Sequence, residues 1–307
     1  MKIKKILVPT DFSDGARVAF DLALVTAAEH GAEIHLLHVV TLLGDDPNTA
    51  GDDLPEIEVL VKTLENRAVS SLRLLIESAD VGSVEIKFHT VRAIAAAPAI
   101  IDYTQEEEID LTILGTHGRR GLRRFLLGSV TDEVVRTLNG SVITVGGQAE
   151  VGANGFQQIA VPYDFSPDSD HALDIAIELA RVSDGEIELV HVFVSPVPYA
   201  SVGGVGVMVP DQQGLVAGCR ERLESMAEQR ASETGVEIRA TVLESYSEAA
   251  LVGYIDDVNV DLIVIGSRGV TGIWRLVLGS VTEKVIRTAE APVWVARKGT
   301  DSECLRR

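Results

Sequence analysis

The sequence predicts an α/β protein with two repeated, doubly wound domains, each a five-stranded parallel sheet with helices on both faces. Three observations support this fold class: segments of the first half return in the second half, short aliphatic runs of strand length recur in each half, and helical stretches lie between these runs. The length of 307 residues fits two domains, since a domain has on the order of 150 residues. With 46% hydrophobic and 24% charged residues, the composition excludes a mainly disordered protein.

The repeat relates the two halves of the chain over most of their length. Residues 6–13, ILVPTDFS, return as IAVPYDFS at residues 159–166. A duplication on this scale indicates two copies of a domain rather than an array of short repeats. Two further segments match in the same way: residues 34–40 with 187–193, and residues 110–137 with 261–288.

The boundary between the two copies falls in the Gly-rich segment GGQAEVGANG, which has neither helical nor strand periodicity. We therefore expect a first domain at residues 1–147, a linker at residues 148–155 and a second domain at residues 156–300. The tail that follows lies outside the repeat.

Apolar runs alternate with helical stretches along the first half. Helices are expected at residues 16–30, 56–78 and 129–138. Strands that are separated by helices need crossover connections, which favour a parallel sheet. The apolar runs largely lack polar alternation, as strands buried on both faces do, and they cover residues 3–8, 34–39, 84–91, 111–114 and 142–145.

The first helix of each half begins after a polar capping residue. Ser13 has this place in the first half, and Ser166, followed by Pro167, has it in the second. Asp11 and Asp164 therefore fall at the carboxyl end of the first strand of each copy. Open parallel sheets bind their ligands at this end.

Charge and hydropathy exclude several classes of function. The formal net charge of −19 repels nucleic acid and anionic lipid, so we expect neither as a partner. No apolar run is long enough to cross a membrane, and the apolar stretch near the N-terminus is too short for a signal peptide, which predicts a cytoplasmic protein. Cys219 and Cys304 indicate neither a disulfide framework nor a metal site.

A glycine pattern after the fourth strand is the sharpest chemical signal. Gly115 and Gly118 are followed, after nine residues, by Gly128 and Ser129. Glycine lets an anion approach backbone N–H groups, and the start of a helix adds further N–H donors. The pattern therefore predicts a phosphate site. The alternative is an ordinary turn. It is neither a Walker loop nor a dinucleotide fingerprint. The pattern returns with the same spacing at Gly266, Gly269, Gly279 and Ser280.

Two histidines, His38 and His191, occupy equivalent positions near the end of the second strand. A histidine at a strand end is usually packed and hydrogen-bonded, and no nucleophile recurs at the spacing of a triad. We therefore assign no catalytic residue. The other histidines lack metal-ligand spacing, and we assign no metal ligand.

Taken together, these motifs resemble the universal stress protein family in its tandem two-domain form. The resemblance covers residues 3–297. It rests on V-P-x-D-F-S in the first strand, H-V in the second strand, and the G-x-x-G, nine residues, G-S signature, each present in both halves. It implies the strand order 3-2-1-4-5 in each domain. For members with the complete glycine signature it also implies bound ATP, with or without Mg²⁺.

The resemblance further implies one adenine-nucleotide site per repeat. In the first repeat, Pro9 would shape the pocket wall, Asp11 would contact the adenosine, and Val39 would bind the adenine through its backbone. The phosphates would be held by Gly115, Gly118, Gly128 and Ser129. The matching residues of the second repeat are Pro162, Asp164, Val192, Gly266, Gly269, Gly279 and Ser280.

Members of the family pair their last strands across a two-fold axis. The resemblance implies that residues 142–145 and 293–296 do this within one chain, which makes an intrachain pseudo-dimer. A homodimer of two such chains is an open alternative.

Three functions agree with these features. The first is an ATP-binding protein with a regulatory or stress-response role, whose ATP-bound and empty forms contact an unidentified protein partner differently. The second is a slow ATPase or a protein that phosphorylates itself at Ser129 or Ser280, although we identify no metal carboxylate and no group that positions a nucleophile. The third is a nucleotide-free interaction scaffold, which the intact glycines count against.

Overall fold

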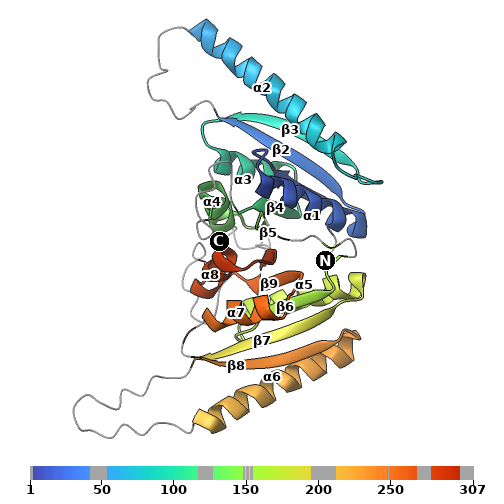
Figure 1. Ribbon diagram of the computed structural model, residues 1–307, viewed down its shortest axis with the longest axis vertical. Helices are drawn as coiled ribbons and strands as arrows, with labels where there is room; N and C mark the ends of the chain where they lie inside the picture. Colours follow the sequence, from blue (N-terminus) through green and yellow to red (C-terminus); the bar gives the residue numbers. More distant parts are fainter. Residues whose placement is uncertain are drawn as a thin grey trace, which may run out of the picture. The chain divides into compact units, whose positions relative to one another are not determined.

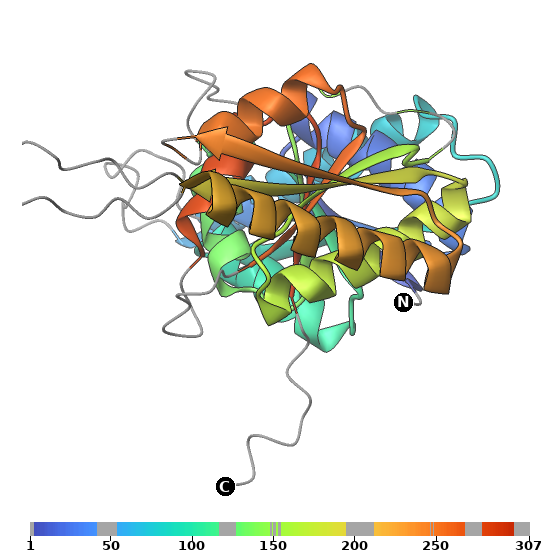
Figure 2. The ribbon, with the colours of Figure 1, turned by 90° about the horizontal axis from the view of Figure 1, so that it is seen from below.

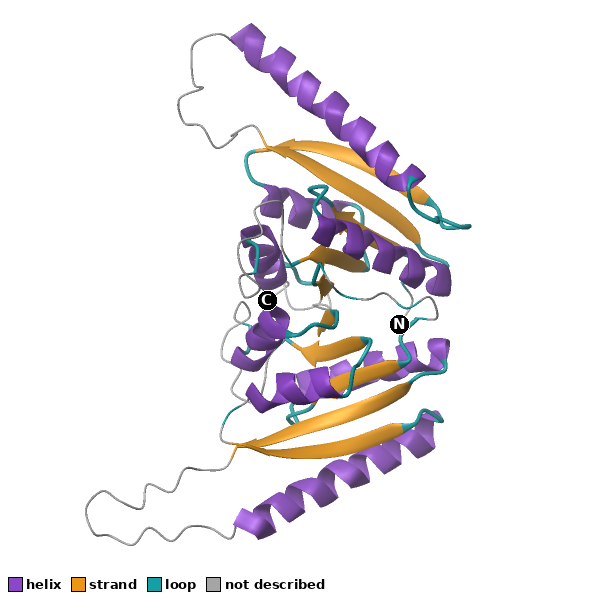
Figure 3. Ribbon diagram, in the orientation of Figure 1, coloured by secondary structure: helices purple, strands orange, loops and turns teal. Residues whose placement is uncertain are grey.

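The computed structural model describes residues 3–41, 54–116, 127–147, 155–194, 212–245, 249–267 and 278–297, together with residues 149, 152 and 247. The chain divides into two compact units, of which unit 1 runs to Gly155 and unit 2 spans Phe156–Arg297. Each unit is described by itself. Figure 1 labels the helices and strands, and Figure 3 shows the strands of each unit among its helices.

Unit 1 is an open parallel sheet with the strand order β3-β2-β1-β4-β5. This order confirms the predicted fold class. It places the first strand beside the fourth, so that the loops after both strands meet at one edge of the sheet. The elements are β1 (Lys5–Pro9), α1 (Asp14–His30), β2 (Glu33–Thr41), α2 (Leu54–Glu77), β3 (Ile86–Ala93), α3 (Ala96–Glu106), β4 (Leu111–Gly115), α4 (Ser129–Thr137) and β5 (Ser141–Val145).

Unit 2 repeats this arrangement with the strand order β8-β7-β6-β9-β10, again with parallel pairs. The second copy thus confirms that the duplicated sequence folds twice in the same way. Its elements are β6 (Gln158–Pro162), α5 (Pro167–Ser183), β7 (Glu186–Val194), α6 (Gln212–Thr234), β8 (Ile238–Ser245), α7 (Ala249–Asp257), β9 (Leu262–Gly266), α8 (Ser280–Thr288) and β10 (Val293–Ala296).

Helices cover both faces of each sheet. Right-handed crossovers place the first two helices of a unit on one face and the last two on the other, and Figure 2 shows α6 and α7 on opposite sides of β8. The central strands are therefore buried on both faces, and Ile6, Leu7 and Val8 of β1 are fully inaccessible to solvent. This double burial explains why the strands read as continuous apolar runs.

Several elements begin about two residues from the expected position, and one helix was not expected. β3 begins at Ile86 because the chain makes a turn just before it, in which the Val84 N–H donates to the carbonyl of Val81 (3.0 Å). Helix α3 was not expected from periodicity, since its first turns are almost entirely small or apolar and carry no polar face.

The predicted helix caps are confirmed. The Ser13 hydroxyl accepts a hydrogen bond from the N–H of Ala16 (3.3 Å), and the Ser166 hydroxyl accepts one from the N–H of Ser169 (3.2 Å). Pro167 occupies the first turn of α5, where its missing N–H costs no hydrogen bond. These caps set the point at which the chain leaves the first strand of each unit.

Candidate functional site

A cavity of about 970 Å³ opens at the carboxyl ends of β1, β2 and β4 in unit 1. Its volume falls within the range of small-molecule sites, roughly 300–1,000 Å³. The structure brings five of the predicted site residues together in its wall, which are Pro9, Asp11, Val39, Gly115 and Ser129.

The loop after β1 presents Asp11 to this cavity in a fixed orientation. One carboxylate oxygen of Asp11 accepts hydrogen bonds from the Ser13 N–H (3.0 Å) and from the Ser13 hydroxyl (2.6 Å). Between them, Phe12 adopts a positive φ of 64°, which turns the chain sharply from the strand into α1. The Asp11 carboxylate thus both stabilises this turn and lies in the cavity wall.

The corresponding loop of unit 2 has the same construction. The Asp164 carboxylate accepts a hydrogen bond from the Ser166 N–H (3.0 Å), and Phe165 has a φ of 63°. Pro162 ends β6, and Val192 lies in β7, in register with Leu243 of β8. These residues therefore lie at the carboxyl end of the unit 2 sheet.

His38 ties β2 to the loop after β1. Its Nδ1 lies 2.7 Å from the carbonyl oxygen of Thr10, and because a carbonyl only accepts hydrogen bonds, Nδ1 carries the proton. The Phe12 ring packs on the imidazole with a centroid distance of 4.6 Å. In unit 2, His191 Nδ1 lies 2.7 Å from the Tyr163 carbonyl oxygen. His38 thus holds the wall of the unit 1 cavity in place, and His191 makes the same link between strand and loop in unit 2.

Gly115 and its counterpart Gly266 are required by the approach of a helix. A Cβ on Gly115 would lie 2.6 Å from the carbonyl carbon of Gly15, at the start of α1. A Cβ on Gly266 would lie 2.9 Å from the carbonyl carbon of Asp168, at the start of α5. Their spacing in the sequence predicts that these glycines let a phosphate approach, whereas the structure supplies a packing reason that holds without any ligand.

Helix α4 begins at the cavity with Ser129, and Gly128 is its N-cap. Glycine has no side chain to cap the helix, so the N–H groups of the first turn remain available to an anion. The Gly128 N–H donates to the Thr116 carbonyl (2.8 Å), which fixes the direction of the turn. Helix α8 begins in the same way, with Gly279 as N-cap and Ser280 as first residue. Gly118 and Gly269 lie outside the described residues.

Helix α2 contributes residues to the cavity that no sequence motif predicts. Leu64, Arg67, Ala68 and Ser71 of this helix line it, as does Ile100 of α3. No motif marks these positions, because only the burial of α2 against the sheet shows which of its residues face the cavity.

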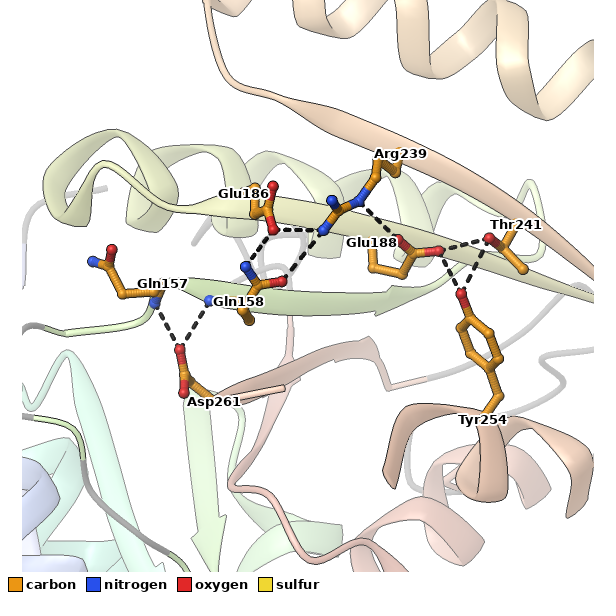
Figure 4. Close-up of polar contacts among 8 residues, drawn as sticks. All are labelled: Gln157, Gln158, Glu186, Glu188, Arg239, Thr241, Tyr254 and Asp261. Atoms are coloured by element: carbon orange, nitrogen blue, oxygen red, sulfur yellow. Dashed lines mark hydrogen bonds and ion pairs between the residues drawn. The ribbon is translucent and has the colours of Figure 1, made fainter. Parts of the chain in front are cut away.

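A separate polar cluster lies near the amino ends of the unit 2 strands (Figure 4). The Asp261 carboxylate accepts the N–H groups of Gln157 and Gln158, both at 2.9 Å, and thereby joins the start of β9 to the start of β6. The carboxylate of Glu188 accepts hydrogen bonds from the hydroxyls of Thr241 (2.6 Å) and Tyr254 (2.8 Å).

The same place in unit 1 holds a histidine instead of a glutamate. His35 is almost fully buried, and its Nδ1 lies 2.8 Å from the hydroxyl of Tyr103. Its Nε2 lies 3.0 Å from Glu33, whose pKa is lowered by hydrogen bonds from Lys87 and from His35. These clusters join helix to sheet.

Within the described part of the chain, no group of three or more His, Cys, Asp or Glu residues could hold a metal ion. No helix among the described residues is long and apolar enough to span a membrane.

Comparison with known proteins connects this chain to one family. The family model described as "Universal stress protein family" matches residues 2–146 and again residues 155–297. Universal stress protein MJ0531 of Methanocaldococcus jannaschii is 33% identical over 147 residues, covering 48% of this chain and 85% of the relative. Universal stress protein Slr1230 of Synechocystis is 22% identical over 311 residues, covering 96% of this chain and all of the relative.

Solved structures show the same fold. The crystal structure of a universal stress protein from Archaeoglobus fulgidus matches with a TM-score of 0.69 at 22% sequence identity. The match covers 97% of this chain and all of that one. At this level of identity the likeness shows the fold, so that the nature of a ligand has to be argued from the residues of the cavity.

Proposed function

Since this chain belongs to the universal stress protein family, we propose that each unit binds one molecule of ATP at the carboxyl ends of its strands and that the protein acts as a nucleotide-dependent regulator. The observation that carries this proposal is the cavity of unit 1, in whose wall five residues from four separate parts of the chain meet: Pro9, Asp11, Val39, Gly115 and Ser129.

The cavity offers complementary groups to the two ends of an adenine nucleotide. Val39, at the end of β2, has backbone N–H and C=O groups that suit the edge of a base, and the nearby Asp11 carboxylate accepts hydrogen bonds from base or ribose. At the other end, the Ser129 hydroxyl and the uncapped first turn of α4 suit an anion. The matched glycine signature in unit 2 supports a second site there.

The same residues explain why we propose regulation rather than rapid catalysis. Phosphoryl transfer requires a metal-binding carboxylate near the phosphates and a group that orients the nucleophile. The described lining of the cavity contains one carboxylate, Asp11, one of whose oxygens accepts hydrogen bonds from Ser13. We therefore expect Mg²⁺, where present, to arrive on the phosphates of ATP. A bound and an empty form that differ in affinity for a partner protein would make such a site regulatory.

The test is to purify the full chain without added nucleotide, denature it, and separate the released small molecules by anion-exchange chromatography beside adenine-nucleotide standards. We expect close to two ATP per chain. Recovery of ADP would favour the slow ATPase, with phosphate release as the follow-up measurement. No released nucleotide, together with no binding of millimolar ATP in equilibrium dialysis, would refute the proposed function and favour the interaction scaffold.

A variant pair makes the test specific for the site. Gly128→Val combined with Gly279→Val puts a side chain at both helix starts and is expected to abolish ATP binding. Gly140→Val is the control, because a Cβ at Gly140 meets nothing within 4 Å. Circular dichroism of each variant verifies that the loss of binding is not a loss of fold.

A further inference from the structure

Helix α2 places one cation in the wall of the unit 1 cavity. Arg67 is the one Arg or Lys side chain among the described residues that line it, and Asp11 is the one carboxylate. Arg67 is exposed, and it has no hydrogen bond or ion pair to the described part of the chain. In a protein with a net charge of −19, an arginine at a cavity that has no carboxylate partner among the described residues is available to an anionic ligand.

Unit 2 has an arginine at the equivalent position, but its guanidinium is already engaged. The buried residues Val61, Ala68 and Leu72 of α2 have the same spacing as Val216, Leu223 and Ala227 of α6. This alignment pairs Arg67 with Arg222, each one residue before the middle member of the buried set. The Arg222 guanidinium carbon lies 4.2 Å from the centroid of the Phe165 ring, in a cation–π contact.

The space beside the arginine also differs between the units. In unit 1 its neighbours on α2 that line the cavity, Ala68 and Ser71, are small, and so is Thr10 in the cavity wall. The alignment of α2 with α6 puts larger residues, Leu223 and Met226, at the places of Ala68 and Ser71, and the repeat of residues 6–13 puts Tyr163 at the place of Thr10. Tyr163 is 3% exposed and Leu223 is fully buried, so both fill space against the sheet.

We infer that Arg67 binds the phosphate groups of the nucleotide in unit 1, an inference that rests on the proposed function. Arg67 then makes that site select charged nucleotides over adenosine. Unit 2, in which Arg222 stacks on Phe165 and bulkier residues border it, then binds the same nucleotide more weakly. Guanidinium groups suit this role because they donate several N–H groups in a planar fork to phosphate oxygens.

The test is isothermal titration calorimetry of the full chain with two probes, ATP and adenosine. Arg67→Gln removes the cation. Arg73→Gln is the matched control, since Arg73 is exposed on the same helix and does not line the cavity, so that both variants change the net charge equally. Arg222→Gln tests the counterpart in unit 2.

Wild-type protein is expected to show two classes of ATP sites. Arg67→Gln should weaken the tighter class for ATP about tenfold or more, because a hydrogen bond to a charged group is lost, and should leave adenosine binding within about twofold. Arg73→Gln and Arg222→Gln should leave the tighter class unchanged.

Three results would overturn the inference: ATP binding unchanged in Arg67→Gln, an equal loss of ATP and adenosine binding, or an equal effect of Arg73→Gln. A wild-type chain that binds neither probe would refute the nucleotide site itself. The two failures are therefore distinguishable.

Discussion

Replacement of Gly115 by alanine tests whether packing of α1 or approach of a phosphate requires glycine at the end of β4. In the structure, the added Cβ would lie 2.6 Å from the Gly15 carbonyl carbon, 2.8 Å from the Gly15 oxygen and 2.9 Å from the Ala16 nitrogen. All three are backbone atoms at the start of α1. They cannot rotate away as the end of a side chain can, so the helix start itself must shift.

The size of the effect follows from these distances. Carbon atoms pack at about 3.5–4.0 Å, so the helix start must move by about 1 Å. Overpacking of this kind typically costs about 1–3 kcal/mol, and the reduced freedom of the unfolded chain with alanine offsets about 0.4–1 kcal/mol of it. A net loss of about 1.3 kcal/mol corresponds to a melting temperature about 3–5 °C lower for a unit of about 150 residues.

The assay is thermal unfolding followed by far-UV circular dichroism in the absence of nucleotide. Gly140→Ala is the control, since a Cβ there meets nothing within 4 Å. Gly266→Ala, with its nearest contact at 2.9 Å instead of 2.6 Å, should destabilise unit 2 by a smaller amount. Both tryptophans of the chain lie in unit 2, so their fluorescence follows that unit selectively.

If Gly115→Ala and Gly140→Ala have the same melting temperature, the contact with α1 is not what requires glycine at position 115. The approach of a phosphate would then be the better explanation. The reasoning would also be wrong if Gly266→Ala lost more stability than Gly115→Ala, because the order of the two distances predicts the opposite.

Two further predictions concern the polar clusters that join helix to sheet. Tyr254→Phe removes the hydroxyl that donates to Glu188, which is 8% exposed, and should lower the free energy of unfolding of unit 2 by about 1.5–3 kcal/mol; urea unfolding followed by tryptophan fluorescence measures this, and an unchanged midpoint would contradict it. The hydrogen bond from Lys87 holds the pKa of Glu33 below its usual 4.5, so the stability that this carboxylate contributes is present above pH 4.5 and is lost as the pH falls through its lower folded value. Glu33→Gln should therefore lose less stability than wild type on acidification, as followed by circular dichroism in urea, whereas Glu77→Gln should behave like wild type.

Much of the fold could be predicted because its signals are local or repeated. Strands buried on both faces read as continuous apolar runs, and Ser13 and Ser166 mark helix starts wherever the rest of the chain lies. The parallel order then brings the strand ends to one edge, so Asp11 and Val39 could be expected to lie near each other before their contacts were known. Helix α3 escaped prediction because its apolar first turns have no helical polarity pattern.

The sequence by itself thus determined the duplication, the fold class, the helix caps and the end of the sheet where Asp11 lies, since each depends on the periodicity or chemistry of a short segment. The tertiary structure decided the rest. It showed that Gly115 accommodates the backbone of α1, that Arg67 borders the cavity, and that Arg222 is held on Phe165. These facts depend on contacts between residues far apart in the chain, which the pattern within one segment does not record.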